Sequence, residues 1–282
     1  MKKGFTLIEV VGIIVILGVV ALFSVPALTS TLKESADKGY DEYEKDIKIA
    51  AESYFHGETD GIINDKYYIT IGTLAEEGYL KKEINPKTNV ETANTATIII
   101  TKNEDKTENY EFNEEYKIPN QYKEGLTLWY DGYTAPVNNT WEDLIGDNDA
   151  SLDKHTYLYN GIKLGSLSST VNISMPYTIE IVFKYQTDVE LVNGISISSN
   201  KLLNKSVEKD TKYTLSIVYT NSNRTVYLNG KQIKSDSEVS ALDSLNFENF
   251  DGRIYAIRIY NSELSSSDIS ENYMVDKYRF GV

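Results

Sequence analysis

The sequence contains no cysteine, only 2 histidines and only 2 tryptophans. Without cysteine there can be no disulfide, no thiol nucleophile and no thiolate metal site. Basic residues are outnumbered by acidic ones, and the formal net charge is -14. No run of lysine or arginine with interleaved aromatic residues offsets the repulsion that this charge creates toward phosphate backbones. We therefore expect no nucleic-acid partner.

Sequence patterns typical of enzymes are also missing. There is no His-Glu-x-x-His helix and no Gly-x-Ser-x-Gly elbow, so His155 has no catalytic partner. Retaining glycosidases need two carboxylates about 5 Å apart, and the strand-like run around Glu180 offers only one. Two other acidic pairs are interpreted as solvated loop charges: Asp188 with Glu190, and Glu142 with Asp143. We expect no enzymatic activity.

The N-terminus carries the longest apolar run, residues 5–28, in which Glu9 is the only charge. About 20 helical residues suffice to cross a bilayer, and Lys2 and Lys3 should stay on the cytoplasmic side. An ordinary secretory signal with cleavage near Ala27 is the alternative. Glu9 argues against that alternative, because a carboxylate inside a membrane segment is costly and usually functional.

The residues Lys3-Gly4-Phe5-Thr6-Leu7-Ile8-Glu9 resemble the start of type IV prepilins and pseudopilins. The resemblance implies that residues 1–4 are a leader, which a prepilin peptidase removes between Gly4 and Phe5, and that the new terminal Phe5 is methylated. It also implies that Glu9 pairs with the amino terminus of a neighbouring subunit in a filament. A carboxylate that reaches back to the membrane interface is the alternative for Glu9.

The family also implies a location and partners. The precursor would lie in a bacterial cytoplasmic membrane with its head outside, and would reach the cell surface after assembly into a pilus. Its partners would be other pilin subunits, contacted through the N-terminal helix, and the inner-membrane assembly machinery.

Beyond the membrane segment, apolar and aromatic residues recur at steps of three and four, as on one face of a helix. They are Leu32, Ala36, Tyr40, Tyr43, Ile47, Ala50 and Tyr54. The spacing predicts one helix over residues 5–57, of which 5–28 form the transmembrane half, with a kink at Pro26. Residues 58–117 are predicted to form a small pilin-like α+β unit with a short helix at 73–80.

After a linker at residues 118–125, residues 126–282 show short alternating segments separated by turns, which is typical of an antiparallel β-sandwich. Three Asn-Gly pairs predict type I′ hairpins: Asn160-Gly161, Asn193-Gly194 and Asn229-Gly230. The predicted fold class is therefore α+β: a long N-terminal helix with a small antiparallel sheet, followed by a β-sandwich of jelly-roll type.

Four segments of the C-terminal part resemble laminin-G-like members of the concanavalin A-like lectin and glucanase superfamily. They are Leu128-Trp129-Tyr130-Asp131-Gly132, Trp141-Glu142-Asp143-Leu144, Tyr227-Leu228-Asn229-Gly230 and the run from Phe250 to Asn261. The resemblance implies a jelly roll that binds glycans, proteins or calcium.

Sugar rings stack on exposed aromatic side chains, so the aromatics of the turn-rich part of this domain are the candidate ligand contacts. They are Tyr130, Tyr133, Trp141, Tyr157 and Tyr159, and the alternative for each is a place in the core. Calcium needs six to eight oxygens, and a loop at 143–153 offers several carboxylates: Asp143, Asp147, Asp149 and Asp153. The alternative is an ordinary acidic loop, and no other cofactor is expected.

These sequence features are compatible with three functions. The first is a minor or specialised pilin whose head adheres to host or surface glycans or proteins. The second is a pseudopilin of a secretion or DNA-uptake system. The third is a membrane-anchored glycan-binding protein that does not polymerise. We expect the first, because a bulky extra domain suits adhesion better than a piston.

Overall fold

The computed structural model describes residues 7–56, 65–82, 84–119 and 124–282. The chain divides into two compact units, residues 1–47 with 83–92, and residues 48–82 with 93–282. The fold class is the predicted one, with one long N-terminal helix, a small antiparallel sheet and an antiparallel β-sandwich. The predicted boundaries at 57–58 and 118–125 fall partly outside the described residues and stay predictions.

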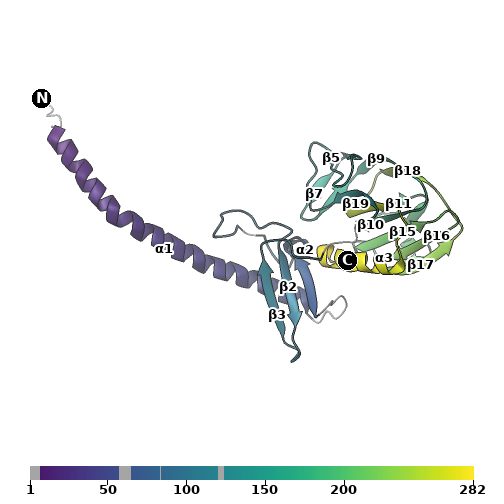
Figure 1. Cartoon of the computed structure of the whole chain (residues 1–282), viewed down its shortest axis with the longest axis horizontal. Coiled ribbons are helices and arrows are strands. Elements are labelled where there is room, and N and C mark those ends of the chain that lie inside the picture. Colours follow the sequence, from purple (N-terminus) through teal and green to yellow (C-terminus); the bar gives the residue numbers. More distant parts are fainter. Residues whose placement is uncertain (1–6, 57–64, 83, 120–123) are drawn as a thin grey trace. The chain divides into compact units, whose positions relative to one another are not determined.

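Helix α1 (Leu7–Phe55) contains Pro26 and curves along its N-terminal half (Figure 1). The predicted stripe becomes buried only in the second half, where Tyr43, Ile47 and Ala50 are less than a tenth exposed while Leu32 is 61% exposed. Within the first unit, the segment at 84–92 lies against the helix, with the Lys87 ammonium 3.8 Å from the centre of the Tyr40 ring. The amphipathic part of α1 is therefore the part that packs within the protein.

The small sheet has the order β1-β2-β3 and is antiparallel throughout. Its strands are β1 (Lys66–Thr70), β2 (Thr97–Lys102) and β3 (Glu108–Asn113). Helix α2 (Ile71–Glu76) follows β1 directly and so begins and ends earlier than the predicted 73–80. Thr70 starts it, because its side chain accepts a hydrogen bond from the Thr73 amide. The residues after Glu76 form a turn with Gly78 at φ +80°.

The sandwich is built from three antiparallel sheets. The largest has the order β17-β16-β15-β10-β19-β8-β7, with β4 also paired to β19. Its strands are β4 (Leu126–Asp131), β7 (Thr156–Leu158), β8 (Gly161–Leu164), β10 (Tyr177–Tyr185), β15 (Tyr213–Tyr219), β16 (Arg224–Leu228), β17 (Lys231–Asp236) and β19 (Gly252–Tyr260).

The two smaller sheets have the orders β18-β9-β6-β5 and β11-β12-β13-β14. The strands of the first are β5 (Thr140–Trp141), β6 (Ala150–Asp153), β9 (Ser166–Ile173) and β18 (Leu242–Phe247). Those of the second are β11 (Val189–Val192), β12 (Ile195–Ser198), β13 (Lys201–Leu202) and β14 (Lys205–Ser206). Alternate residues of these sheets contribute to one continuous apolar core, which includes Trp141, Ile179 and Phe247.

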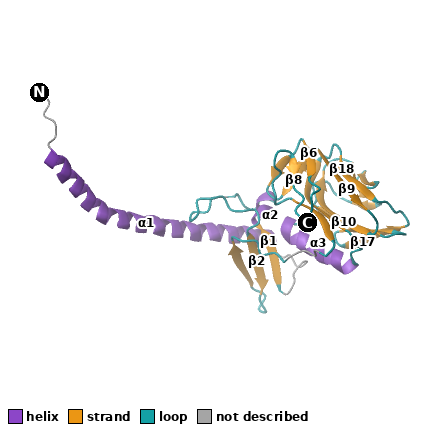
Figure 2. Cartoon of the chain, turned by 45° about the horizontal axis from the view of Figure 1, so that its top comes forward, coloured by secondary structure: helices purple, strands orange, loops and turns teal. Residues whose placement is uncertain are grey.

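Helix α3 (Ser266–Phe280) lies along the sandwich (Figure 2). Ser265 and Asp268 form a capping box at its start, and Gly281 ends it with φ +69°. A second apolar cluster unites Val218 and Tyr260 of the large sheet with Leu264 and Ile269 at the start of the helix. The large sheet is thus buried on both faces, which explains the nearly continuous burial of β10, β15 and β19.

Two of the three predicted hairpin turns are confirmed, since both residues of Asn193-Gly194 and of Asn229-Gly230 have positive φ. The prediction for Asn160-Gly161 is wrong by one residue. The positive φ belongs to Tyr159, and Gly161 is already the first residue of β8. Glycine is needed there for space, because a Cβ would lie 2.8 Å from Arg253 and from the Tyr255 ring.

Candidate functional site

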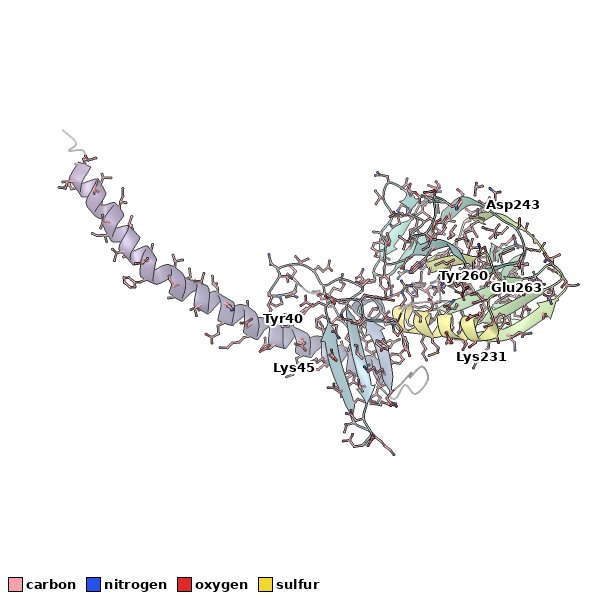
Figure 3. The ribbon with its side chains drawn as sticks, viewed as in Figure 1. Tyr40, Lys45, Lys231, Asp243, Tyr260 and Glu263 are labelled. Atoms are coloured by element: carbon pink, nitrogen blue, oxygen red, sulfur yellow. The ribbon has the colours of Figure 1, made fainter. Side chains whose placement is uncertain are left out.

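The N-terminal half of α1 is apolar on every side. Its most apolar 18-residue window has a mean hydropathy of 2.8 and is 0% buried, and Figure 3 shows side chains projecting all around this part of the helix. Glu9 is the acidic residue of the first turn, and its side chain is exposed among exposed apolar ones. Such a helix fits a membrane anchor or a signal sequence. The predicted processing residues Gly4 and Phe5 lie outside the described residues.

Two predicted ligand-contacting aromatics, Tyr130 and Trp141, are 0% exposed. Their rings stack 5.5 Å apart in the core, where the Trp141 indole donates to the Asp131 carbonyl and Tyr130 donates to the Ser169 hydroxyl. The expectation of exposed rings is not met at these two positions. They alternate inward on β4 and β5, and both faces of each ring are already packed.

The other three predicted aromatics lie together, but mainly against the protein itself. Tyr133 donates to the Thr70 hydroxyl at 2.9 Å and stacks on Phe280 at 5.5 Å. The Tyr157 hydroxyl donates to the Tyr159 carbonyl at 2.9 Å. Tyr159 alone among the five has an exposed side chain, at 37%. The sequence could not distinguish the contacts of Tyr133 from ligand contacts, because its partners Thr70 and Phe280 are distant in the chain.

The acidic loop uses its carboxylates to hold its own backbone. Asp143 is 4% exposed and accepts hydrogen bonds from the amides of Trp129, Ile145 and Asn148. Asp149 accepts from the Asp143 amide at 2.9 Å, whereas Asp147 and Asp153 are exposed. In the described part of the chain, no three acidic or histidine side chains are grouped so that they could hold a metal ion.

Glu180 of β10 is fully buried beneath α3 rather than at a surface. Arg258 lies between it and Asp276, with its Nε 3.0 Å from Glu180 and its Nη1 2.8 Å from Asp276. All three side chains are 0% exposed. Burial raises the pKa of Glu180 and is opposed by the charge of Arg258. This enclosed triad fastens α3 to the sheet and has no opening for a substrate. The predicted absence of enzymatic activity stays a prediction.

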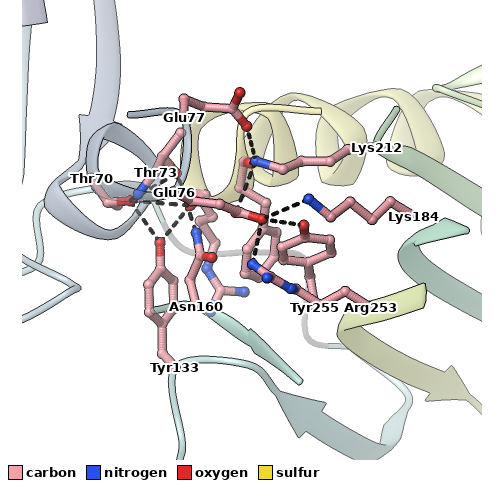
Figure 4. Close-up of polar contacts among 12 residues, drawn as sticks. Thr70, Thr73, Glu76, Glu77, Tyr133, Asn160, Lys184, Lys212, Arg253 and Tyr255 are labelled. Carbon is pink, nitrogen blue, oxygen red and sulfur yellow. Dashed lines mark hydrogen bonds and ion pairs between the residues drawn. The ribbon is translucent and has the colours of Figure 1, made fainter. Parts of the chain in front are cut away.

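The densest polar contacts join α2 to the sandwich (Figure 4). Glu76, at the end of α2, is the centre, and its side chain is 4% exposed. Its four partners all come from the large sheet and its edges: Lys184 at 3.2 Å, Lys212 at 3.0 Å, Arg253 at 2.6 Å and the Tyr255 hydroxyl at 2.5 Å. We call these five residues the Glu76 cluster.

Electrostatics favour the charged form of Glu76. Burial raises the pKa of its carboxyl, but the charges of Lys212 and Arg253 and the Tyr255 hydrogen bond together leave the pKa below its usual value of 4.5. A buried carboxylate with three cations is a strong link between elements, because removing the carboxylate leaves the cations uncompensated. The cluster therefore makes the small sheet and the sandwich one unit.

The end of α3 adds a second set of contacts beside this cluster. The carbonyl of Arg279 accepts hydrogen bonds from Thr73 at 2.8 Å and from Thr70. The guanidinium of Arg279 reaches Asp131 at 2.5 Å. The Asn160 amide donates to Thr73 at 3.3 Å. The sequence analysis predicted neither the Glu76 cluster nor the contacts at the end of α3. Single charges within the otherwise apolar strand β19, such as Arg253 and Arg258, could have indicated that buried ion pairs form there.

No protein-family profile matches the sequence, and no curated protein matches it. Among solved structures, the chain is similar to a Trypanosoma rangeli sialidase in complex with sialic acid, with 12% identity and a TM-score of 0.45 over 65% of this chain and 43% of that chain. It is also similar to the binding domain of botulinum neurotoxin serotype D, with 15% identity and a TM-score of 0.41 over 53% of this chain and 51% of that one. The chain thus spans less than half of the sialidase. Similarity at this level carries no information on ligand or activity.

Proposed function

We propose that this protein is a minor or specialised subunit of a type IV pilus, which displays its β-sandwich at the bacterial surface for adhesion. The supporting observation is the division of α1 into two parts. Its first part is exposed and apolar apart from Glu9, and its second part buries an aromatic stripe. A helix of this kind can insert in a membrane and then pack against copies of itself while it carries a folded head outside.

Glu9 is central to the proposal. A carboxylate in an apolar environment is unfavourable unless an opposite charge lies nearby. Cleavage before Phe5 would create such a charge, an α-amino group, at the start of each neighbouring subunit. The Glu9 carboxylate would then set the register between subunits as they leave the membrane.

The first test is the mature N-terminus. We expect protein sheared from the cell surface to begin at Phe5, as read by Edman degradation or by mass spectrometry of the terminal peptide. A start near Leu28 would indicate ordinary signal cleavage and would rule out the pilus subunit. An uncleaved chain that is absent from sheared material would favour a membrane-anchored protein that does not polymerise.

The second test is Glu9→Val, compared with Glu9→Asp, which keeps the charge. We expect Glu9→Val to be processed and inserted normally but to lower the amount of sheared filament protein about tenfold, equivalent to ~1.4 kcal/mol. Glu9→Asp should lie between Glu9→Val and the wild type. Equal yields from all three proteins would contradict the assembly role of the carboxylate.

A further inference from the structure

The outer face of the sheet β18-β9-β6-β5 carries a row of small polar side chains that crosses all four strands. Asn246 pairs with Ser168, Ser168 with Ser151, and Ser151 with Thr140. All four side chains are exposed, whereas their neighbours along the strands, such as Phe247, are buried. Because side chains alternate along a strand, the row faces solvent while the intervening residues fill the core.

Two hollows adjoin this row and share Ser151, Ser168 and Asn246. Their volumes are about 330 and 560 Å³. The smaller extends past Asp153 and the larger past Asp149, so that together they follow β9 between β6 and β18. We call this surface the polar groove.

The hydroxyl groups at the centre of the polar groove are available to a ligand. In the described part of the chain, the side chains of Ser151 and Ser168 make no hydrogen bond to another protein group, and Asn246 donates one to Ser244 at 2.8 Å. Hydroxyl and amide groups both donate and accept, as the hydroxyl groups of sugars do.

The charge of the polar groove narrows the choice of ligand. Carboxylates line both ends, and none of the described residues that line it is lysine or arginine. An anionic ligand would therefore meet repulsion without a compensating cation. The apolar lining residues are core residues such as Leu152 and Leu167, which are at most 3% exposed. The surface thus offers no pocket for the apolar side chains of a peptide.

We infer that the polar groove binds a neutral glycan chain, which lies along β9 and is held by hydrogen bonds. This inference rests on the proposed adhesive function. None of the five aromatics predicted from the sequence lines the polar groove. Without aromatic stacking, affinity at one site is weak, and a filament that presents many copies compensates through avidity.

The test uses the full-length protein in a zwitterionic detergent that carries no sugar headgroup. Binding to immobilised neutral polysaccharides, such as dextran and galactomannan, is compared with binding to anionic ones, such as polygalacturonate and heparin. Three variants are measured beside the wild type. Ser168→Leu blocks the groove, the double variant Ser151→Ala with Ser168→Ala removes two hydroxyls without adding bulk, and Gln232→Leu makes a matched change on exposed strand β17.

We expect the wild type to bind a neutral polysaccharide, Ser168→Leu to lose binding, and the double alanine variant to bind about tenfold more weakly. Gln232→Leu should bind as the wild type does, and all variants should keep the wild-type melting temperature. If both groove variants still bind the neutral polysaccharide, the glycan does not bind in the polar groove. The proposed adhesive function would not be contradicted by that result. A wild type that binds only anionic polysaccharides, or none, would overturn the ligand class. The N-terminal sequencing and Glu9 tests of the pilus proposal are independent of either result.

Discussion

Glu76 shows how a single side chain can determine the architecture around it. Its carboxylate lies within 3.2 Å of three cationic groups, and these come from positions 108 to 177 residues further along the chain. No local pattern in the sequence indicates that such a residue is buried, since a glutamate near the end of a short helix is ordinarily solvated. Its role becomes apparent only when the strands are assembled.

Replacing Glu76 with the isosteric glutamine should destabilise the protein by about 3–5 kcal/mol at neutral pH, because Lys212 and Arg253 lose their counter-charge. The pKa of Glu76 in the folded protein lies below its usual 4.5. Its stabilising contribution is therefore complete above pH 4.5 and is lost as the pH falls through the folded pKa. Urea unfolding of wild type and Glu76→Gln across this range should show the difference shrinking in acid.

A matched control is Glu115→Gln, since Glu115 also has a lowered pKa, caused by Lys117, but its side chain is 80% exposed. No measurable change in stability is expected for it. A Glu76→Gln difference that stays constant with pH would show that folding does not shift the pKa of Glu76, and would contradict the lowered pKa.

At the scale of elements, the sequence predicted what depends on local pattern and missed what depends on distant pairing. The long helix follows from a period of three to four residues, and the hairpins at Asn193 and Asn229 follow from two residues each. The error at Asn160 arose because Gly161 is required by Arg253 and Tyr255, whose contact with β8 is not local. Tyr130 and Trp141 were misjudged for the same reason, since an inward strand position and an exposed loop position look alike in a turn-rich segment.

The attachment of α3 to the large sheet can be tested by substituting the buried charges that hold it. Arg258→Met leaves Glu180 and Asp276 buried without their shared cation, and should cost about 3–5 kcal/mol. The control is Lys234→Met, which removes an ion pair with Asp236 at 2.8 Å in which the lysine side chain is 39% exposed. Because that pair is partly solvated, its loss should cost less than about 1 kcal/mol. The triple change of Glu180→Leu, Arg258→Met and Asp276→Leu should regain part of the loss, as measured by thermal unfolding. A triple variant less stable than Arg258→Met alone would contradict this account.

At the scale of the molecule, the small sheet and the sandwich share one compact unit, residues 48–82 with 93–282. A fragment of residues 118–282 retains the strands of the sandwich but lacks Glu76 and the α2 surface on which the end of α3 packs. We expect it to fold with a lower melting temperature than a fragment of residues 66–282, by about 2–4 °C for each kcal/mol lost. Calorimetry of the two fragments tests this, and equal melting temperatures would show that the sandwich does not depend on α2.

The position of Arg279 sets the order in which the chain can complete its fold. The hydroxyl of Thr73 donates to a carbonyl that lies 206 residues later in the chain. In the proposed pilus subunit, which would cross the membrane from its N-terminus, Glu76 of α2 can reach its sandwich partners first, but Thr73 lacks the Arg279 carbonyl until α3 has emerged. A chain interrupted before α3 would leave Thr70 and Thr73 without the Arg279 carbonyl as acceptor, and an extracytoplasmic protease would meet it incompletely folded. Under the proposed pilus function, only chains synthesised through α3 would then remain for assembly.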